Sequence, residues 1–196
     1  MKKYTGIFIV LGLIVLLGGC GGCGYNSMVK MDQEVKRAWG NVQSDYQRRS
    51  DLIPNLVNTV KGAANFEQET LEKVISARSK ATQTTVDASN LSPENIKKFQ
   101  EAQAELSSSI GRLLVSVERY PDLKANANFR DLQAQLEGTE NRIKVARNDY
   151  NTAVQSYNTT VKTFPTNLMA GIFGFTEKGY FEAEAGSEKA PTVDFK

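Results

Sequence analysis

The 196-residue sequence predicts an all-α protein, an up-and-down four-helix bundle preceded by an N-terminal membrane-targeting segment. Two long stretches repeat apolar residues at alternating spacings of three and four, which is the spacing of one helix face. No strand-like alternation persists before residue 165. A short basic and apolar leader opens the chain, as in proteins addressed to a membrane.

The leader comprises residues 1–24. Lys2 and Lys3 precede an apolar run over residues 7–17, and glycines follow it. This order is typical of a secretory signal. The sequence Leu17-Gly18-Gly19-Cys20 is similar to a bacterial lipobox, in which Cys20 is the lipidated residue.

A single transmembrane span is the alternative form of the anchor. The apolar run is shorter than the about 20 residues that cross a bilayer, but no charge occurs between Tyr4 and Val29. Both forms place the protein at the cell envelope with a membrane as partner. The two leading lysines predict a cytoplasmic N-terminus and an extracytoplasmic bundle.

The bundle is predicted over residues 25–165, with helices at about 25–49, 51–86, 92–120 and 128–164. A break near residue 50 is favoured because Arg48 and Arg49 suit a helix C-terminus, Asp51 suits an N-cap, and Pro54 is tolerated in a first turn. Two alternatives stay open. The apolar rhythm continues through this region, as it would in a merely kinked helix, and Gly62 offers a second break.

The third and fourth helices carry the clearest patterns. Ser92 is a natural N-cap and Pro93 suits the first helical position. The first stripe consists of Ile96, Phe99, Gln103, Leu106, Ile110, Leu113, Val117 and Tyr120, with Gln103 as its polar member. The second consists of Leu132, Leu136, Thr139, Ile143, Ala146, Tyr150, Ala153 and Tyr157, extended by Val161 and Phe164. Residues 82–91 are polar and form the predicted connector.

The C-terminal tail, residues 166–196, is rich in aromatic side chains. Phe173, Phe175, Tyr180 and Phe181 belong to it. Such residues are rarely solvated, so the tail is expected to dock on the bundle. The alternative is a partner-binding segment whose aromatic side chains serve as anchors.

Composition excludes several classes of chemistry. The chain has no His, which removes histidine-based nucleophile systems and common zinc and di-iron sites. Its two cysteines, Cys20 and Cys23, both lie in the leader. Without Lys2 and Lys3, the basic residues equal the 22 acidic ones, so no electrostatic footprint for nucleic acid exists. No catalytic residue, cofactor or metal is predicted.

The sequence resembles the LemA family over about residues 25–182. The resemblance rests on Arg48-Arg49-Ser50-Asp51-Leu52-Ile53-Pro54-Asn55-Leu56, on Ala38-Trp39, Ala77-Arg78 and Tyr157-Asn158, and on the C-terminal aromatic pairs. It implies a four-helix bundle on a membrane-anchored bacterial envelope protein, with no catalytic residues to carry over. Members commonly start with a plain spanning helix, and the Cys20 arrangement departs from that pattern.

Three function hypotheses follow. The favoured one is a non-enzymatic envelope scaffold or adaptor, with Arg48, Arg49, Asp51, Phe173 and Phe175 as candidates for docking an envelope protein. The second is a carboxylate-based or metal-dependent hydrolase, which requires a concave cluster of acidic residues. Its candidates are the pairs Glu101/Glu105 and Glu137/Glu140. The third is a helical bundle that binds a small ligand in an apolar cavity.

Overall fold

The computed structural model describes residues 2–62 and 66–183, with side chains from residue 24 onward. Within these ranges the chain forms six α-helices and no strand, which confirms the predicted all-α class. The helices are α1 (Lys2–Lys61), α2 (Gln68–Gln83), α3 (Pro93–Val117), α4 (Pro121–Ala125), α5 (Ala127–Lys162) and α6 (Thr166–Phe173).

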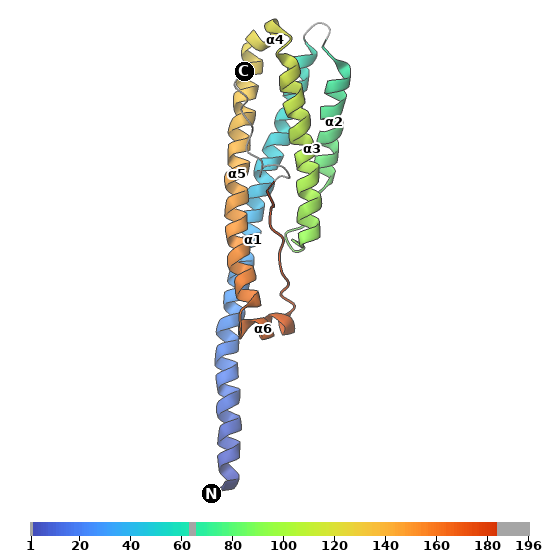
Figure 1. Ribbon diagram of the computed structural model, residues 1–196. Helices are drawn as coiled ribbons and strands as arrows, with labels where there is room; N and C mark the ends of the chain where they lie inside the picture. Colours follow the sequence, from blue (N-terminus) through green and yellow to red (C-terminus); the bar gives the residue numbers. More distant parts are fainter. Residues whose placement is uncertain (1, 63–65, 184–196) are drawn as a thin grey trace, which may run out of the picture.

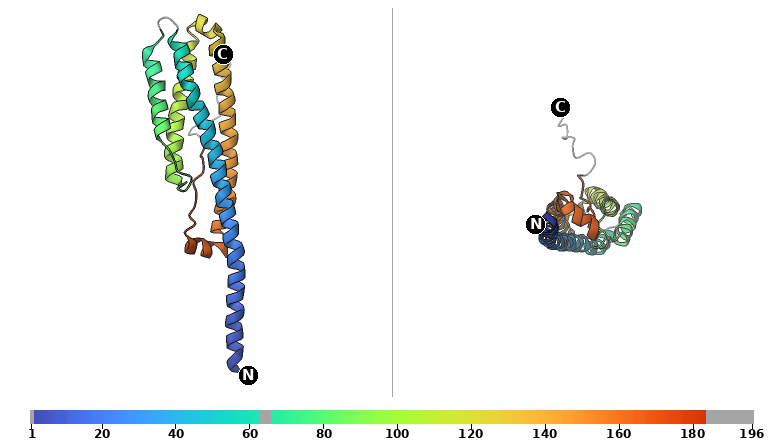
Figure 2. Two further views of the ribbon diagram at one scale, coloured as in Figure 1. Left: turned by 180° about the vertical axis from the view of Figure 1, so that it is seen from behind. Right: turned by 90° about the horizontal axis from the view of Figure 1, so that it is seen from below.

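Four long helices make up the body of the molecule. α1, α2, α3 and α5 lie side by side, and each runs opposite to the one before it (Figure 1). α1 and α5 form the longest pair, and the shorter α2–α3 hairpin packs beside them (Figures 1 and 2). The two predicted stripes face this interior. Apolar members that are buried include Ile96, Leu106, Leu113, Ile143, Tyr150 and Tyr157.

The interior divides into two apolar clusters along the body. One surrounds Trp39, which is fully buried between α1, α3 and α5 and makes an edge contact with Phe99 at 5.1 Å between ring centroids. The other joins α1, α2 and α3 around Leu56, Val74 and Leu106. Burying these side chains on several helices at once holds the helices together, because each amphipathic helix alone would expose its stripe to water.

The predicted break near residue 50 is wrong. α1 continues without interruption to Lys61, and the chain leaves the helix at Gly62, the second of the two candidate breaks. The predicted helices 25–49 and 51–86 are therefore replaced by α1 and α2. Ile53, Leu56 and Val60 continue the buried stripe of the preceding turns, so breaking the helix would have lost that burial.

Pro54 is accommodated by a contact from another helix. A proline has no N–H, so the carbonyl of Ser50, four residues earlier, loses its helical donor. Arg78 of α2 supplies a replacement, because its Nε–H donates to the Ser50 carbonyl oxygen at 2.8 Å. Pro54 itself lies on the exposed side of α1. The hydrogen bond that Pro54 removes from α1 is thus replaced by one from α2, and the helix does not end there.

The start of α3 follows the prediction, whereas the end of α5 does not. Ser92 caps α3 as predicted, and its hydroxyl accepts the Asn95 N–H at 3.3 Å. α5 ends at Lys162, and Thr163 adopts an extended conformation. Phe164 is consequently 74% exposed, so its predicted place in the buried stripe is wrong. The first tail residues form α6, and residues 174–183 run back along the body (Figure 1).

The N-terminal part of α1 extends beyond the other helices (Figure 1). Among the residues searched, which are the described ones only, no helix has the length and apolarity needed to cross a bilayer. The structure describes no side chain before residue 24. The side chains of the predicted signal segment and of the lipobox, Cys20 included, therefore lie outside the described part. The form of the anchor therefore stays a prediction.

Candidate functional site

A buried arginine ties the long helices together at mid-body. Arg49 is 2% exposed. Its Nη1 donates to Ser107 Oγ at 2.5 Å and to Glu140 Oε2 at 3.0 Å. Its Nη2 donates to the Gln103 carbonyl at 3.2 Å and to Gln103 Oε1 at 2.7 Å. One side chain of α1 thereby binds both α3 and α5.

Gln103 extends this network to α2. Its Nε2 donates to the Ala81 carbonyl at 3.3 Å, in the last turn of α2. The Arg49 guanidinium also lies 5.0 Å from the centre of the Tyr46 ring. Paired and hydrogen-bonded in this way, a buried charge fixes the register of its neighbours, because any sliding would leave polar groups unsatisfied.

The arrangement differs from the capping role expected of the Arg48–Asp51 segment. No helix ends here, so capping is wrong, and the carboxylate that pairs with Arg49 is Glu140 of α5. Arg48 and Asp51 are exposed, and Asp51 accepts a hydrogen bond from Gln47 at 2.7 Å. The sequence signal for the network is Gln103, a polar residue inside an otherwise apolar stripe.

Residues 174–183, which we call the C-terminal strap, are clamped between α3 and α5. Three side-chain amides each bind both the N–H and the C=O of one strap residue, as a neighbouring β-strand would. The pairs, with distances of 2.8–3.1 Å, are Asn158 with Lys178, Asn151 with Phe181, and Gln100 with Glu182. These contacts recognise backbone atoms, so they fix position without depending on the strap's side chains.

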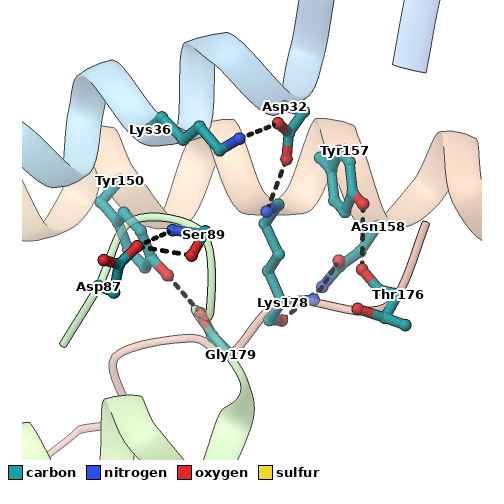
Figure 3. Close-up of polar contacts among 10 residues, drawn as sticks. All are labelled: Asp32, Lys36, Asp87, Ser89, Tyr150, Tyr157, Asn158, Thr176, Lys178 and Gly179. Atoms are coloured by element: carbon teal, nitrogen blue, oxygen red, sulfur yellow. Dashed lines mark hydrogen bonds and ion pairs between the residues drawn. The ribbon is translucent and has the colours of Figure 1, made fainter. Parts of the chain in front are cut away.

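Two tyrosines of α5 complete the clamp. Tyr157 donates to the Thr176 carbonyl at 3.1 Å and Tyr150 to the Gly179 carbonyl at 3.0 Å (Figure 3). Burial raises the pKa of Tyr150, and burial together with the negative charge of Asp32 raises the pKa of Tyr157 to about 12. Both hydroxyls therefore stay protonated and can donate at neutral pH.

Two strap side chains are anchored in the body. Phe181 is 5% exposed and packs on Trp39 at 6.1 Å between ring centroids. Lys178 is 7% exposed, and its Nζ lies 2.7 Å from Asp32 Oδ1 (Figure 3). Burial acts to raise the pKa of Asp32, but hydrogen bonds from Lys178 and Lys36 outweigh it and hold that pKa below its ordinary value. The expected docking of the tail is confirmed for this stretch.

A second feature is an exposed aromatic end, formed by α6 and Tyr25. The Tyr25 ring packs against Phe173 at 4.8 Å and Phe175 at 5.8 Å between centroids. Phe173 is 51% exposed, whereas Phe175 is partly buried against the core. The two docking candidates of the tail thus lie together, at the end of the body from which the N-terminal part of α1 emerges (Figure 1).

The paired glutamates do not gather into one acidic cluster in the described residues. Glu101, Glu105, Glu137 and Glu140 are all exposed, on α3 and α5. Glu105 pairs with Lys80 and Glu140 with Arg49, so both serve as links between helices. In the parts of the chain that the structure describes, no three acidic or thiol side chains gather where a metal ion could bind. Among the described residues, these two glutamate pairs therefore do not supply the carboxylate cluster that the hydrolase hypothesis requires.

Sequence reasoning missed most of the clamp. Asn151, Gln100 and Tyr150 gave no binding signal, because their partners are backbone atoms of residues about 30 to 80 positions away. Asn158 was visible only within the Tyr157-Asn158 pair that resembles the family ending. Arg78 was visible in the same way, through Ala77-Arg78.

Comparisons with known proteins agree with the resemblance. The model of the LemA family matches residues 38–195, which include the arginine network and the strap. Protein LemA of Metamycoplasma hominis is 28% identical over 145 residues, 74% of this chain and 63% of that protein.

Magnetosome protein MamQ 2 of Paramagnetospirillum magneticum is 25% identical, with 84% of this chain and 66% of that protein covered. Magnetosome protein MamQ of Magnetospirillum gryphiswaldense is 26% identical, with 83% and 66% covered. The chain spans just under two thirds of the length of each of these relatives. Since the family model covers most of the sequence, the chain belongs to the LemA family.

Proposed function

We propose that the chain is a non-enzymatic scaffold of the bacterial envelope: an up-and-down four-helix bundle, held at the membrane by residues 1–24, that docks a protein partner outside the cytoplasm. The observation that carries this proposal is the continuity of α1. One helix of 60 residues joins the apolar leader to the full length of the body.

A continuous helix transmits position and orientation better than a flexible linker does. At 1.5 Å per residue, the 37 residues of α1 that follow the leader, 25–61, span about 56 Å. The arginine network and the strap clamp then fasten α3 and α5 to this helix. These features stiffen the molecule and bring no reactive groups together, which suits a post that holds a partner at a fixed distance from a membrane.

The names of the relatives are compatible with a role that is not enzymatic. Those from Paramagnetospirillum magneticum and Magnetospirillum gryphiswaldense are named as magnetosome proteins, and none of the three names denotes an enzyme.

Arg48 and Asp51 are the accessible docking candidates on the side of the body. They are exposed on the same helix that buries Arg49, so the network beneath holds them in place. Arginine is favoured at the centres of protein interfaces. Phe173 and Phe175, the other two candidates, lie at the aromatic end beside the leader, where a membrane competes with a protein partner for the exposed Phe173 ring.

Photo-crosslinking in living cells tests the proposal. A photoreactive amino acid at Arg48 or at Asp51 of the full-length chain is expected to capture one defined envelope protein in the membrane fraction. The same amino acid at Arg130, an exposed arginine of α5, is the matched control. The scaffold proposal fails if the two test positions capture nothing, or capture only what the control position captures.

A further inference from the structure

α6 lies across the end of the body, crosswise to the long helices (Figure 1). The view from below shows it spanning that end beside the emerging α1 (right panel of Figure 2). Its start is fixed against α1, since a Cβ on Gly24 would lie 3.2 Å from Thr166 Cγ2. Thr166 also donates to the Thr160 carbonyl at 2.5 Å, and Ala170 is buried. The position of α6 is therefore set by packing.

The outward side of this segment is apolar and exposed. In the described part of the chain, nine large apolar side chains are exposed, and five of them belong to this one end. They are Tyr25 (38%), Phe164 (74%), Leu168 (59%), Ile172 (75%) and Phe173 (51%). Leu168 and Ile172 are one helical turn apart, so they share a face of α6. An apolar patch of this kind marks a contact surface.

Charge is absent from the patch and returns at its margin. No Asp, Glu, Lys or Arg occurs between Lys162 and Glu177. These two residues flank the segment and pair with each other, with Lys162 Nζ 2.6 Å from Glu177 Oε1. Because the segment between these two residues carries no charge, placing it against acyl chains would bury no ionic group.

The leader leaves the body at this same end. Tyr25 follows Cys20 by five positions, which is about 8 Å along a helix. A lipid on Cys20 would thus hold Tyr25 within about 8 Å of the bilayer, and an uncleaved apolar segment would also hold this end of the body at the membrane. Because the patch is continuous with the anchor, the surface that covers it is expected to be the lipid bilayer.

We propose that α6 is an interfacial helix: it lies flat in the head-group region of the bilayer, with Phe164, Leu168, Ile172 and Phe173 against the acyl chains. Such helices bury an apolar face to a depth of about 5–10 Å. Because α6 crosses the axis of the body, this contact holds the long helices upright on the membrane. The inference rests on the proposed membrane anchor and specifies the orientation of the scaffold.

Depth-dependent quenching of tryptophan tests the contact. Full-length chains with Leu168→Trp or Ile172→Trp are reconstituted into vesicles of phosphatidylcholine and phosphatidylglycerol whose acyl chains carry bromine. The native Trp39 is fully buried and provides the background in the unsubstituted chain. We expect both variants to lose emission, more with bromine near the head group than near the chain end. Val115→Trp is the control, because Val115 is 73% exposed in the last turn of α3, far from α6.

Flotation of the same vesicles separates the two proposals. If the chains float but neither α6 variant is quenched more than Val115→Trp, the anchor stands and the interfacial helix is refuted. If the α6 variants are not quenched and an added amine-reactive cross-linker joins them into dimers, a second copy covers the patch and the lipid contact is again refuted. Chains that do not float refute the anchor, and the lipid contact fails with it.

Discussion

Gly179→Ala gives a sharp test of the packing between the strap and the α2–α3 hairpin. Gly179 is buried where the strap crosses the start of α3. A Cβ on this residue would lie 2.6 Å from Pro93 Cα, 3.0 Å from Pro93 N and 3.1 Å from the Ser92 carbonyl oxygen. All three are backbone atoms that cannot rotate away, so the strap itself must move.

The expected loss follows from what the strap would give up. Gly179 N–H donates to the Leu91 carbonyl at 2.8 Å, and its own carbonyl accepts from Tyr150 at 3.0 Å. Each bond contributes about 0.5–1.5 kcal/mol. Phe181, two residues on, would lose part of a burial worth roughly 1.5–3 kcal/mol. We expect the free energy of unfolding to fall by about 2–5 kcal/mol.

Gly138→Ala is the matched control with the opposite sign. Gly138 lies inside α5, and a Cβ there would meet nothing within 4 Å. Alanine should therefore raise the free energy of unfolding by roughly 0.5–1 kcal/mol. Urea titrations followed by Trp39 fluorescence measure both variants, since the Trp39 ring lies against Phe181. An unchanged midpoint for Gly179→Ala, with Gly138→Ala behaving as expected, would refute the close packing of the strap.

Four further measurements test other parts of the molecule. Arg49→Met should lower the free energy of unfolding by about 2–4 kcal/mol, which is somewhat less than for a fully buried ion pair because the partner Glu140 is over half exposed. Arg48→Met, the control, should change it by about 0.5 kcal/mol or less. Equal effects of the two substitutions in thermal melts would contradict the network. Because its pKa is raised, Tyr157 contributes stability that is fully present below its ordinary pKa of 10 and is lost as the pH rises toward about 12. In urea titrations at several pH values, Tyr157→Phe should reduce the fall of the free energy of unfolding with alkaline pH. The same fall in both proteins would be inconsistent with this role. Because its pKa is lowered, Asp32 contributes stability that is present above its ordinary pKa of 3.8 and is lost as the pH falls further. Asp32→Asn should remove this part of the fall of the free energy of unfolding with acid pH. If the fall is unaltered in the variant, groups other than Asp32 cause it. The intact mass of the mature chain should correspond to a lipid-modified Cys20 at the N-terminus, whereas a retained Met1 would exclude the lipoprotein form.

The helical class and the inward faces were predictable because they depend on local spacing. Residues three and four apart share a helix face whatever surrounds them, so the stripes through Ile96 and Ile143 already identify the core. The Ser92 cap is equally local, since its hydroxyl reaches an N–H three residues away.

The course of α1 near residue 50 depended on distant partners. Local signals around Pro54 favour a break, and the structure has none because Arg78, in another helix, satisfies the carbonyl that the proline leaves free. Phe164 shows the reverse case. Its spacing continues the stripe, yet α5 ends before it and the side chain is exposed.

Helical architecture, an apolar leader and family membership are legible in the amino-acid sequence, because periodicity and motifs involve residues that are neighbours along the chain. Three other features emerge only from the packed chain: Arg49 joins three helices, amides of α3 and α5 clamp the strap, and α6 presents an apolar face beside the leader. These features depend on backbone groups and side chains that are far apart along the chain, and only packing brings them within a hydrogen bond or a van der Waals contact of one another.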